Sequence, residues 1–226
     1  MRNGIEDILM DGATQLGITL PQEAIERFFI YLSELKKWNQ KINLTSIESD
    51  RDILIRHFLD SMTVYPFVSH SKRILDIGSG AGFPGIPLKI IDPALEVILV
   101  DSVAKKVSFM RHIIRTLGLA TGGNGIHALH SRIEDAAFIE RHKGYFDRII
   151  SRAFSELEVF VRLALPLCTP GGKIIAMKGP KLGPKLGQEL KGMGTVNGVS
   201  AATVHEVSLP FSDRRTTIIV FEKLVV

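Results

Sequence analysis

Residues 74–85 read ILDIGSGAGFPG, and this stretch decides the fold. Its apolar start is typical of a buried strand, and the glycines from Gly78 onward turn the backbone sharply. Pro84 fits only the first turn of a helix, which fixes where the next helix begins. In an open α/β sheet, ligands bind outside the carboxyl ends of the strands, and the first strand-to-helix turn is the usual place. We therefore predict a ligand-binding loop here.

Two kinds of cofactor compete for this loop. Residues 80–85 match the G-x-G-x-x-G pattern of dinucleotide-binding proteins, and Asp101 lies near the distance expected for a ribose-binding acid. However, the glycines begin directly after the strand at Gly78, and Asp76 stands where dinucleotide enzymes usually keep an apolar residue. Phe83-Pro84 would also crowd a pyrophosphate at the helix N-terminus. S-adenosylmethionine has no phosphate, so the loop favours this methyl donor over a nicotinamide cofactor.

Donor contacts are expected at the loop and after the next two strands. Asp101 is expected to accept hydrogen bonds from two ribose hydroxyls, and its alternative role is the N-cap of the following helix. Ile133 and Glu134 are expected to flank the adenine, although Glu134-Asp135 equally suits the exposed start of a helix. The loop itself is expected to contribute Gly78, Ser79, Gly80 and Gly82.

The rest of the chain alternates helices and strands. Apolar spacing predicts helices at 21–38 and 49–62 before any strand, the second with Ser49 and Asp52 as a capping-box-like start. Seven strands are predicted, at 73–77, 96–100, 126–129, 147–151, 173–177, 204–209 and 216–224. Helices are predicted between them at 85–91, 104–117 and 156–167, and Pro170-Gly171-Gly172 is expected to turn into the fifth strand.

This alternation predicts an α/β fold with a mostly parallel sheet covered on both faces. The last two strands flank Asp213-Arg214-Arg215 as a hairpin, which adds an antiparallel C-terminal strand. Before them, residues 178–198 are expected to form a mobile surface segment with room for a short helix at 187–191. The fold class is therefore a Rossmann-like class I methyltransferase with a seven-stranded sheet. Residues 1–70 would form an N-terminal helical extension and residues 71–226 the S-adenosylmethionine-binding domain.

Bulk properties limit the class of protein. With 226 residues, 45% of them hydrophobic, the chain can bury one substantial core. No apolar run reaches the roughly 18–20 residues that span a bilayer, so no membrane contact is expected. The single cysteine, Cys168, excludes a disulfide framework and a multi-cysteine zinc site, so we expect no metal and a reducing cytoplasm. A net charge of +4 leans mildly toward a polyanionic partner.

Further motifs resemble one family. They are LKKWN at 35–39, NLTS at 43–46, RHFLDS at 56–61, the loop with Pro87, Asp101-Ser102 with Lys105-Lys106, SRAF at 151–154, and PGG at 170–172 with Lys178-Gly179. Together they resemble the bacterial ribosomal RNA small subunit methyltransferase G family, also called glucose-inhibited division protein B. The resemblance covers residues 31–179.

The resemblance implies methyl transfer to N7 of a guanine in 16S ribosomal RNA, with this RNA or the small ribosomal subunit, assembled or partly assembled, as the partner. Ser102 lies in a matching segment and is expected beside the donor, and the donor contacts implied directly are Gly78, Phe83, Ile133, Glu134 and Arg152. Guanine N7 carries an in-plane lone pair and no proton, so attack on the sulfonium methyl needs alignment and no general base. No catalytic residue is therefore certain, and Arg152 is a candidate positioning residue whose alternative is an exposed salt bridge.

Basic residues are candidates for contacts with RNA phosphates. Arg56 and His57 share a predicted helix, Lys178 follows the fifth strand, and Arg214 and Arg215 lie in the hairpin. His57 equally suits a packed core position, and each lysine and arginine equally suits a solvated surface charge.

Other functions remain open at this point. A small-molecule methyltransferase would close a lid over its site and bind independently of salt. An NAD(P)-dependent reductase would bind NAD(P)H and ignore S-adenosylmethionine, and an RNA-binding domain could keep the loop as a vestige. No long apolar surface stripe demands a partner subunit, so a monomer is expected.

Overall fold

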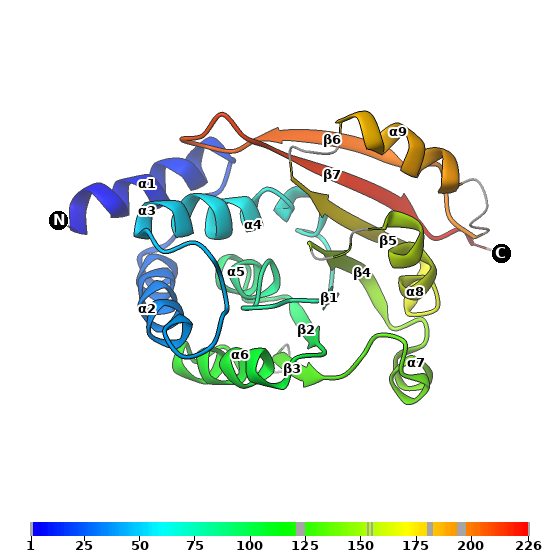
Figure 1. Cartoon of the computed structure of the whole chain (residues 1–226), viewed down its shortest axis with the longest axis horizontal. Helices are drawn as coiled ribbons and strands as arrows, with labels where there is room; N and C mark the ends of the chain where they lie inside the picture. The colour runs from blue at the N-terminus through cyan, green and yellow to red at the C-terminus, as the bar shows by residue number, and fades with distance from the viewer. Residues whose placement is uncertain are drawn as a thin grey trace.

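The computed structural model describes residues 2–120, 125–152, 154, 156–179, 183–193 and 198–225. At its centre lies a seven-stranded sheet in the order β3-β2-β1-β4-β5-β7-β6 (Figure 1). The strands are β1 (Arg73–Ile77), β2 (Glu96–Asp101), β3 (Ile126–His130), β4 (Phe146–Ser151), β5 (Cys168–Lys178), β6 (Thr203–Ser208) and β7 (Arg215–Glu222). All seven predicted strands are present.

The sheet is parallel over its first five strands and antiparallel at one end. β1 pairs in parallel with both β2 and β4, and β7 runs antiparallel to β5 and to β6. Parallel strands place their carboxyl ends at the same edge of a sheet, so the segments after β1, β2, β3, β4 and β5 converge. The predicted mostly parallel α/β sheet with a closing hairpin is confirmed.

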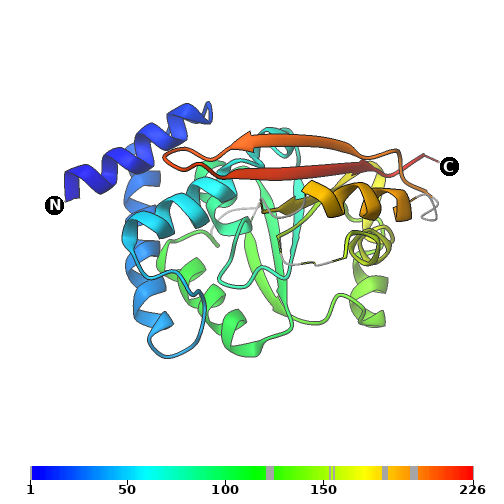
Figure 2. The same ribbon diagram turned by 45° about the horizontal axis from the view of Figure 1, so that its top comes forward.

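Helices cover both faces of the sheet (Figures 1 and 2). Along β2, Val97 and Leu99 belong to one buried apolar cluster, whereas Ile98 and Val100 belong to the other. This alternation follows from the period of two in a strand. The first cluster packs under α5 (Gly85–Ile91) and α6 (Ala104–Thr116), and the second under α7 (Ala136–His142), α8 (Leu157–Ala164) and α9 (Gly183–Gly192).

The N-terminal part is helical up to β1. Its elements are α1 (Arg2–Gln15), α2 (Gln22–Asn39), α3 (Asp50–Ile53), the π-helical η1 (Leu54–Leu59), α4 (Asp60–Met62) and the 3₁₀ turn η2 (Tyr65–Phe67). The second predicted helix is the run from α3 to α4, and the Ser49 hydroxyl caps it by accepting a hydrogen bond from the backbone N–H of Asp52 at 3.1 Å. Neither α1 nor the π-helical geometry was expected.

Aromatic side chains join the N-terminal helices to the sheet. Tyr31 of α2 stacks on Phe58 of η1 at 5.2 Å between ring centroids and on Phe83 of the glycine loop at 5.4 Å. All three rings lie in the same buried cluster as the sheet residues Val97 and Leu99. The N-terminal helices therefore share one core with this face of the sheet, and the division at residue 70 remains a prediction.

Three local predictions are wrong. Pro170-Gly171-Gly172 is no turn before the fifth strand but part of β5, because Gly171 at φ 71° absorbs an irregular register there and its N–H still bonds to the sheet. The helix predicted to reach 167 ends at Ala164, with Leu165 as a C-cap in helical geometry, because Pro166 has no N–H to continue the hydrogen-bond ladder. In the described residues of segment 178–198, a helix is present as expected, but α9 spans ten residues rather than the five predicted at 187–191, because Leu186 and Leu190 pack on the second cluster.

Candidate functional site

The glycine loop after β1 has a backbone that only glycine adopts readily. Gly78, Gly80 and Gly82 have φ angles of 70°, 61° and 97°. The N–H groups of Gly78 and Ser79 donate to the carbonyl of Val100, which folds the loop back over the end of β2. Gly85 is required for space, because a Cβ there would lie 2.3 Å from Leu99 Cδ2. The loop is thus held flat against the carboxyl edge of the sheet.

Asp101, the last residue of β2, fastens the loop to the neighbouring turn. Its Oδ2 accepts a hydrogen bond from the N–H of Gly80 at 2.9 Å, and its Oδ1 accepts one from the N–H of Val103 at 2.8 Å. The N-cap of α6 is Val103, so the alternative role of Asp101 as that cap is wrong. A carboxylate has about four acceptor positions, so further hydrogen bonds from a ligand remain available to it.

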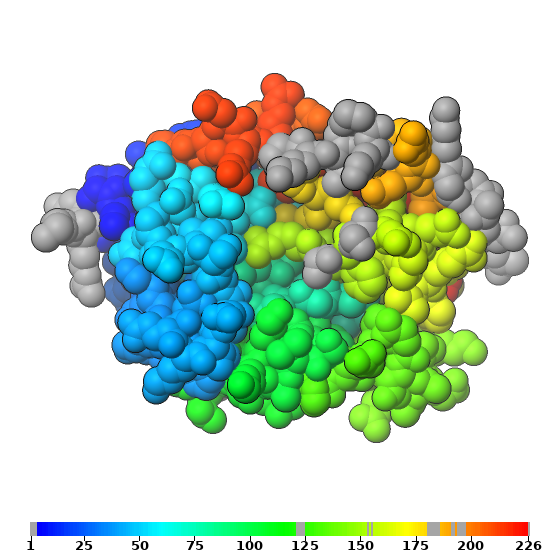
Figure 3. Space-filling view, in the orientation of Figure 1, coloured from blue at the N-terminus to red at the C-terminus, as the bar shows by residue number. Residues whose placement is uncertain are grey.

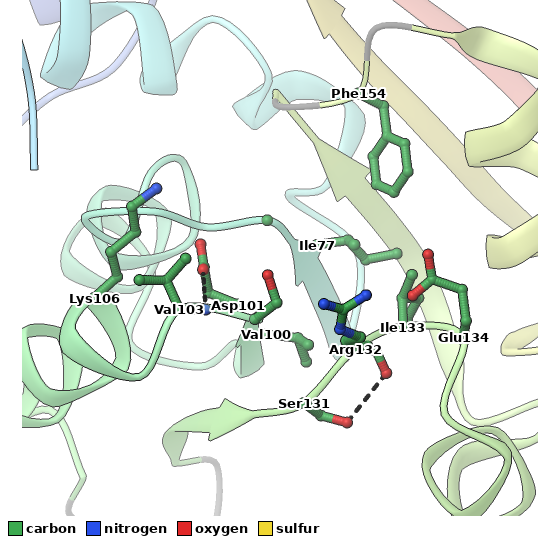
Figure 4. Close-up of a pocket in the computed structure, with 12 residues that line it drawn as sticks. Ile77, Val100, Asp101, Val103, Lys106, Ser131, Arg132, Ile133, Glu134 and Phe154 are labelled. Carbon is green, nitrogen blue, oxygen red and sulfur yellow. Dashed lines mark hydrogen bonds between the residues drawn. The ribbon is translucent and has the colours of Figure 1, made fainter.

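A cavity of about 390 Å³ opens beside this carboxylate (Figure 4). It lies at the carboxyl ends of β1, β2 and β3, and we call it the donor cavity. Its lining includes five predicted cofactor residues, Gly78, Asp101, Ser102, Ile133 and Glu134. It also includes residues that the sequence analysis did not assign to the cofactor: Ile77, Val100, Val103, Lys106, Ser131, Arg132 and Phe154.

Glu134 and Asp135, which follow β3, were predicted either to contact the adenine or to start a helix, and each residue takes one of these positions. Asp135 caps α7, with Oδ1 accepting hydrogen bonds from the N–H groups of Ala137 at 2.8 Å and Phe138 at 3.2 Å. Glu134 is exposed and lines the donor cavity, and Ile133 beside it is buried. The helix start predicted as an alternative therefore belongs to Asp135, which leaves Glu134 facing the cavity.

Four other predicted loop contacts, Ser79, Gly80, Gly82 and Phe83, do not line the donor cavity. Ser79 is buried and its hydroxyl donates to the carbonyl of Asp76 at 2.9 Å. Gly82 lies against Tyr31 and Ile86. Phe83 is buried and stacks on the His57 ring, with centroids 4.7 Å apart and planes at 10°. These residues shape the loop from beneath.

Arg152, just after β4, is fixed by polar contacts to the N-terminal helices. Its guanidinium donates to Oδ2 of Asp60 at 3.1 Å and to Nδ1 of His57 at 3.3 Å. The guanidinium carbon also lies 5.2 Å from the centre of the Phe83 ring. The exposed salt bridge considered as an alternative is thus a partly buried network, with only 25% of the Arg152 side chain exposed.

A second cavity, of about 270 Å³, lies beyond Arg152. It contains all five predicted RNA contacts, Arg56, His57, Lys178, Arg214 and Arg215, and with Arg152 we call it the basic cavity. The remaining lining residues are Ile47, Asp60, Met177, Gly179, Leu209 and Thr216. These residues come from the N-terminal helices, the end of β5 and the β6–β7 hairpin, so the sheet topology brings distant segments of the chain together.

The two cavities are neighbours at one edge of the sheet. Lys178 of the basic cavity donates from Nζ to the carbonyl of Phe154, at 2.5 Å, and Phe154 lines the donor cavity. The space-filling view is hollowed at its centre, between the N-terminal helices and the later segments around α6 and α8 (Figure 3). Phe154, which follows β4, therefore links the linings of the two cavities.

His57 is held as a neutral ring. Burial, followed by the positive charges of Arg152 and Arg56, lowers its pKa to about 3. Its Nδ1 accepts from Arg152, so its Nε2 carries the proton and donates to the hydroxyl of Thr45 at 2.7 Å. With both ring nitrogens bonded and one face on Phe83, His57 has the packed position that was its alternative reading, while still lining the basic cavity.

Asp76 is a fully buried acid beneath the loop. Burial raises its pKa to about 7, although the hydrogen bond from the N–H of Gly85 to Oδ2, at 2.9 Å, opposes this rise. Its Oδ1 has no hydrogen-bond partner. A buried carboxyl group with an unpaired oxygen costs stability and is typical of a functional site.

Comparisons with known proteins show the family of this chain. The sequence model described as rRNA small subunit methyltransferase G matches residues 24–214. The chain belongs to this family. A ribosomal RNA small subunit methyltransferase G from Geobacter metallireducens is 43% identical over 219 residues, which is 96% of both chains. The protein of the same name from Acetivibrio thermocellus is 36% identical over 97% of this chain and 88% of its own.

Solved structures share the fold at low sequence identity. An O-methyltransferase from Bacillus cereus, solved with SAH, has a TM-score of 0.60 at 18% identity and covers 85% of this chain and 90% of its own. Cofactor-bound Rv0187 from MTB has a TM-score of 0.61 at 15% identity, with 88% and 89% covered. The Rossmann-like class I methyltransferase fold is therefore confirmed, and the family makes S-adenosylmethionine the cofactor, as predicted. The nicotinamide reductase alternative has no support.

The sequence analysis missed part of each cavity. Ser131, Arg132 and Phe154 directly follow strands of the sheet, so their positions beyond a strand end were the available signal. Asp60 and Thr216 have no such signal, because they lie on an N-terminal helix and on the last strand. In the described part of the chain, no helix has the length and apolar character required to cross a bilayer.

Proposed function

We propose that the chain transfers the methyl group of S-adenosylmethionine to N7 of a guanine in 16S ribosomal RNA. The observation that carries this proposal is the pair of adjoining cavities at one edge of the sheet. The donor cavity is formed by the glycine loop and an acid, and the basic cavity is lined by five lysine and arginine side chains. Such a concentration of positive charge suits a polyanion, and relatives in the family are named for ribosomal RNA.

The residues of the donor cavity fit the methyl donor. Its volume of about 390 Å³ is in the range of small-ligand sites. Asp101 offers carboxylate oxygens for ribose hydroxyls, and Ile133 with Glu134 offers an apolar and a polar contact for adenine. Gly78 and Ser102 supply backbone that can approach a ligand closely. When bound, S-adenosylmethionine supplies an electrophilic methyl group on its sulfonium.

The chain's own residues suit a transfer without a general base. N7 of guanine has a lone pair and no proton to remove, so alignment of the two reactants is the main requirement. Among the described residues that line the basic cavity, His57 is the one imidazole, and it already uses both ring nitrogens. Its low pKa, about 3, makes it a poor proton acceptor at neutral pH. Arg152 lines the basic cavity and not the donor cavity, is fixed by Asp60 and His57, and is the positioning residue of this proposal.

The RNA would approach over the basic cavity. Arg56, Lys178, Arg214 and Arg215 are assigned to phosphate contacts, and His57 forms a wall behind them. Phosphate contacts fix the orientation of an RNA without reading its sequence. The partner would be 16S RNA, free or within the small subunit, and the enzyme would act as a monomer in the cytoplasm.

Mapping 7-methylguanine in 16S RNA tests this proposal. RNA from cells that lack the gene should lose one 7-methylguanine, and the wild-type gene should restore it. Asp101→Ala should fail to restore it, whereas Asp135→Asn should succeed, because Asp135 is an exposed helix cap that asparagine replaces well. An unchanged 16S RNA after loss of the gene would rule the proposal out.

A further inference from the structure

One acidic side chain stands among the positive charges of the basic cavity. Of the described residues that line this cavity, only Asp60 carries a negative charge, against Arg56, Arg152, Lys178 and the two arginines of the hairpin. It begins α4, directly after the π-helical η1 that carries Arg56 and His57. π-helical turns inside longer helices occur frequently at functional sites.

The Asp60 carboxylate is held in place and keeps acceptor capacity. Its Oδ2 accepts from Arg152 at 3.1 Å, and its Oδ1 accepts from the hydroxyl of Thr216 on β7. Its side chain is 16% exposed. An ionised carboxylate has about four acceptor positions, so two hydrogen bonds from protein groups leave room for two more. The two fixed donors orient the carboxylate, which a recognition group requires.

Guanine has hydrogen-bond donors that match a carboxylate acceptor. Its Watson–Crick edge carries two adjacent donors, N1–H and the 2-amino group, which a carboxylate can accept side by side. Adenine presents an acceptor at N1, which would meet the negative charge unfavourably. N7 lies on the opposite side of the base from this edge. A base held at Asp60 by its Watson–Crick edge would therefore leave N7 free to face away from the carboxylate.

The positive charge that develops on the base during methyl transfer also favours a carboxylate beside it. The base becomes cationic as N7 takes up the methyl group, and the surrounding arginines and lysine would oppose that change. A carboxylate bonded to the base stabilises the cation more than the neutral base, so its effect is greater in the transition state than in the ground state. Resting on the function proposed above, we propose that Asp60 recognises the Watson–Crick edge of the target guanine and offsets the positive charge that develops on it.

The test is a double-mutant cycle that combines the removal of the Asp60 carboxylate with the removal of the 2-amino group of the target guanine. Small subunits are reconstituted with 16S RNA that carries either guanine or inosine at the methylated position, because inosine lacks only the 2-amino group. Methyl transfer is measured as kcat/KM for the wild type, Asp60→Ala and Asp60→Asn. Losing a hydrogen bond to a charged partner costs about 10- to 100-fold, so inosine should reduce the wild-type value by at least about 10-fold.

The expected result is that Asp60→Ala is slow on guanine, by about 100-fold, and discriminates less than about 2-fold between guanine and inosine. Asp60→Asn, which keeps one acceptor oxygen and the side-chain volume, should discriminate to an intermediate extent. If the inosine penalty is the same in the wild type and in both variants, Asp60 does not read the base and the inference fails. That outcome would show a carboxylate that only orients Arg152.

Two controls separate a local effect from general damage. Thr216→Val removes one of the two orienting donors and leaves the carboxylate with its contact to Arg152, so the inosine penalty should stay well above that of Asp60→Ala in this variant. Asp60 does not line the donor cavity, so S-adenosylmethionine should bind each variant within about 2-fold of the wild type. If the wild type does not methylate the guanine substrate at all, the proposed function fails. If the wild type methylates the guanine substrate but the inosine penalty is the same in the wild type and the Asp60 variants, only this inference fails.

Discussion

Replacing Asp76 with asparagine should change how the stability of the protein depends on pH. The side chain is fully buried, and burial raises its pKa from 3.8 to about 7. The folded protein therefore binds this proton more tightly than the unfolded chain does, and its stability falls as pH rises from 3.8 to about 7. At 1.36 kcal/mol per pH unit the full cost is about 4 kcal/mol, of which about 2 kcal/mol falls between pH 5 and pH 7.

Asparagine keeps the volume and the oxygen that accepts from Gly85 but cannot ionise. The free energy of unfolding of Asp76→Asn, measured with urea, should therefore rise relative to the wild type by about 2 kcal/mol between pH 5 and pH 7. Asp135→Asn is the control, because this carboxylate is exposed and its difference from the wild type should stay within about 0.5 kcal/mol.

The difference between the two proteins is the quantity to measure, because the wild-type curve alone hides the effect. His57 acts in the opposite direction: its pKa in the folded state, about 3, lies below the unfolded value, so stability is lost as pH falls below 6.5. Between pH 6.5 and 5 the two groups nearly cancel in the wild type. A difference between Asp76→Asn and the wild type that stays constant from pH 4 to 8 would refute the reasoning.

Three further predictions follow from the same structure. Relative to the wild type, His57→Gln should gain about 1.5 kcal/mol of unfolding free energy as pH falls from 6.5 to 5, because the variant lacks the loss that the buried neutral ring causes; a difference that stays constant between the two pH values in urea unfolding would show that the ring is not held neutral. Gly85→Ala should destabilise the fold by about 1–3 kcal/mol, because its Cβ would lie 2.3 Å from Leu99 Cδ2. By contrast, Gly4→Ala, with open space in α1, should stabilise by about 0.5–1 kcal/mol, and equal melting temperatures for the two variants would contradict this steric argument. Arg214→Gln should lower the slope of log affinity against log salt for 16S RNA by about 1 while donor affinity stays unchanged; an unchanged slope would place Arg214 away from the phosphates.

Helices and strands with a strong apolar period could be predicted from the sequence, and those that depend on distant packing could not. The β1 loop and α6 carry local signals: glycines that adopt positive φ and, after α6, Gly118 at φ 64°. By contrast, α1 depends on Leu9 and Ala13 packing in the shared N-terminal core, and α9 depends on Leu186 and Leu190. Tertiary burial stabilises both helices, and a window of sequence does not contain it.

The residues of the candidate site likewise fall into those that local sequence predicts and those that distant packing brings together. The donor cavity lies at the ends of consecutive parallel strands, so residues such as Asp101 and Glu134 can be predicted from the position of each strand end. The basic cavity joins η1, β5 and the β6–β7 hairpin. Its charged residues could be proposed singly, but neither their meeting nor the role of Asp60 among them was evident before the chain was folded.

The sequence by itself determined the glycine loop, the seven strands in their chain order, and the acid at the end of β2, because each depends on backbone restrictions or apolar periods within a few residues. Only the tertiary structure decided that Phe83 lies beneath the loop, that Arg152 faces the basic cavity, and that Asp60 meets Thr216 from the far end of the chain. The reason is physical: side-chain direction and burial at these positions are set by contacts between segments about 50 to 160 residues apart, and such contacts leave no periodic trace in the sequence.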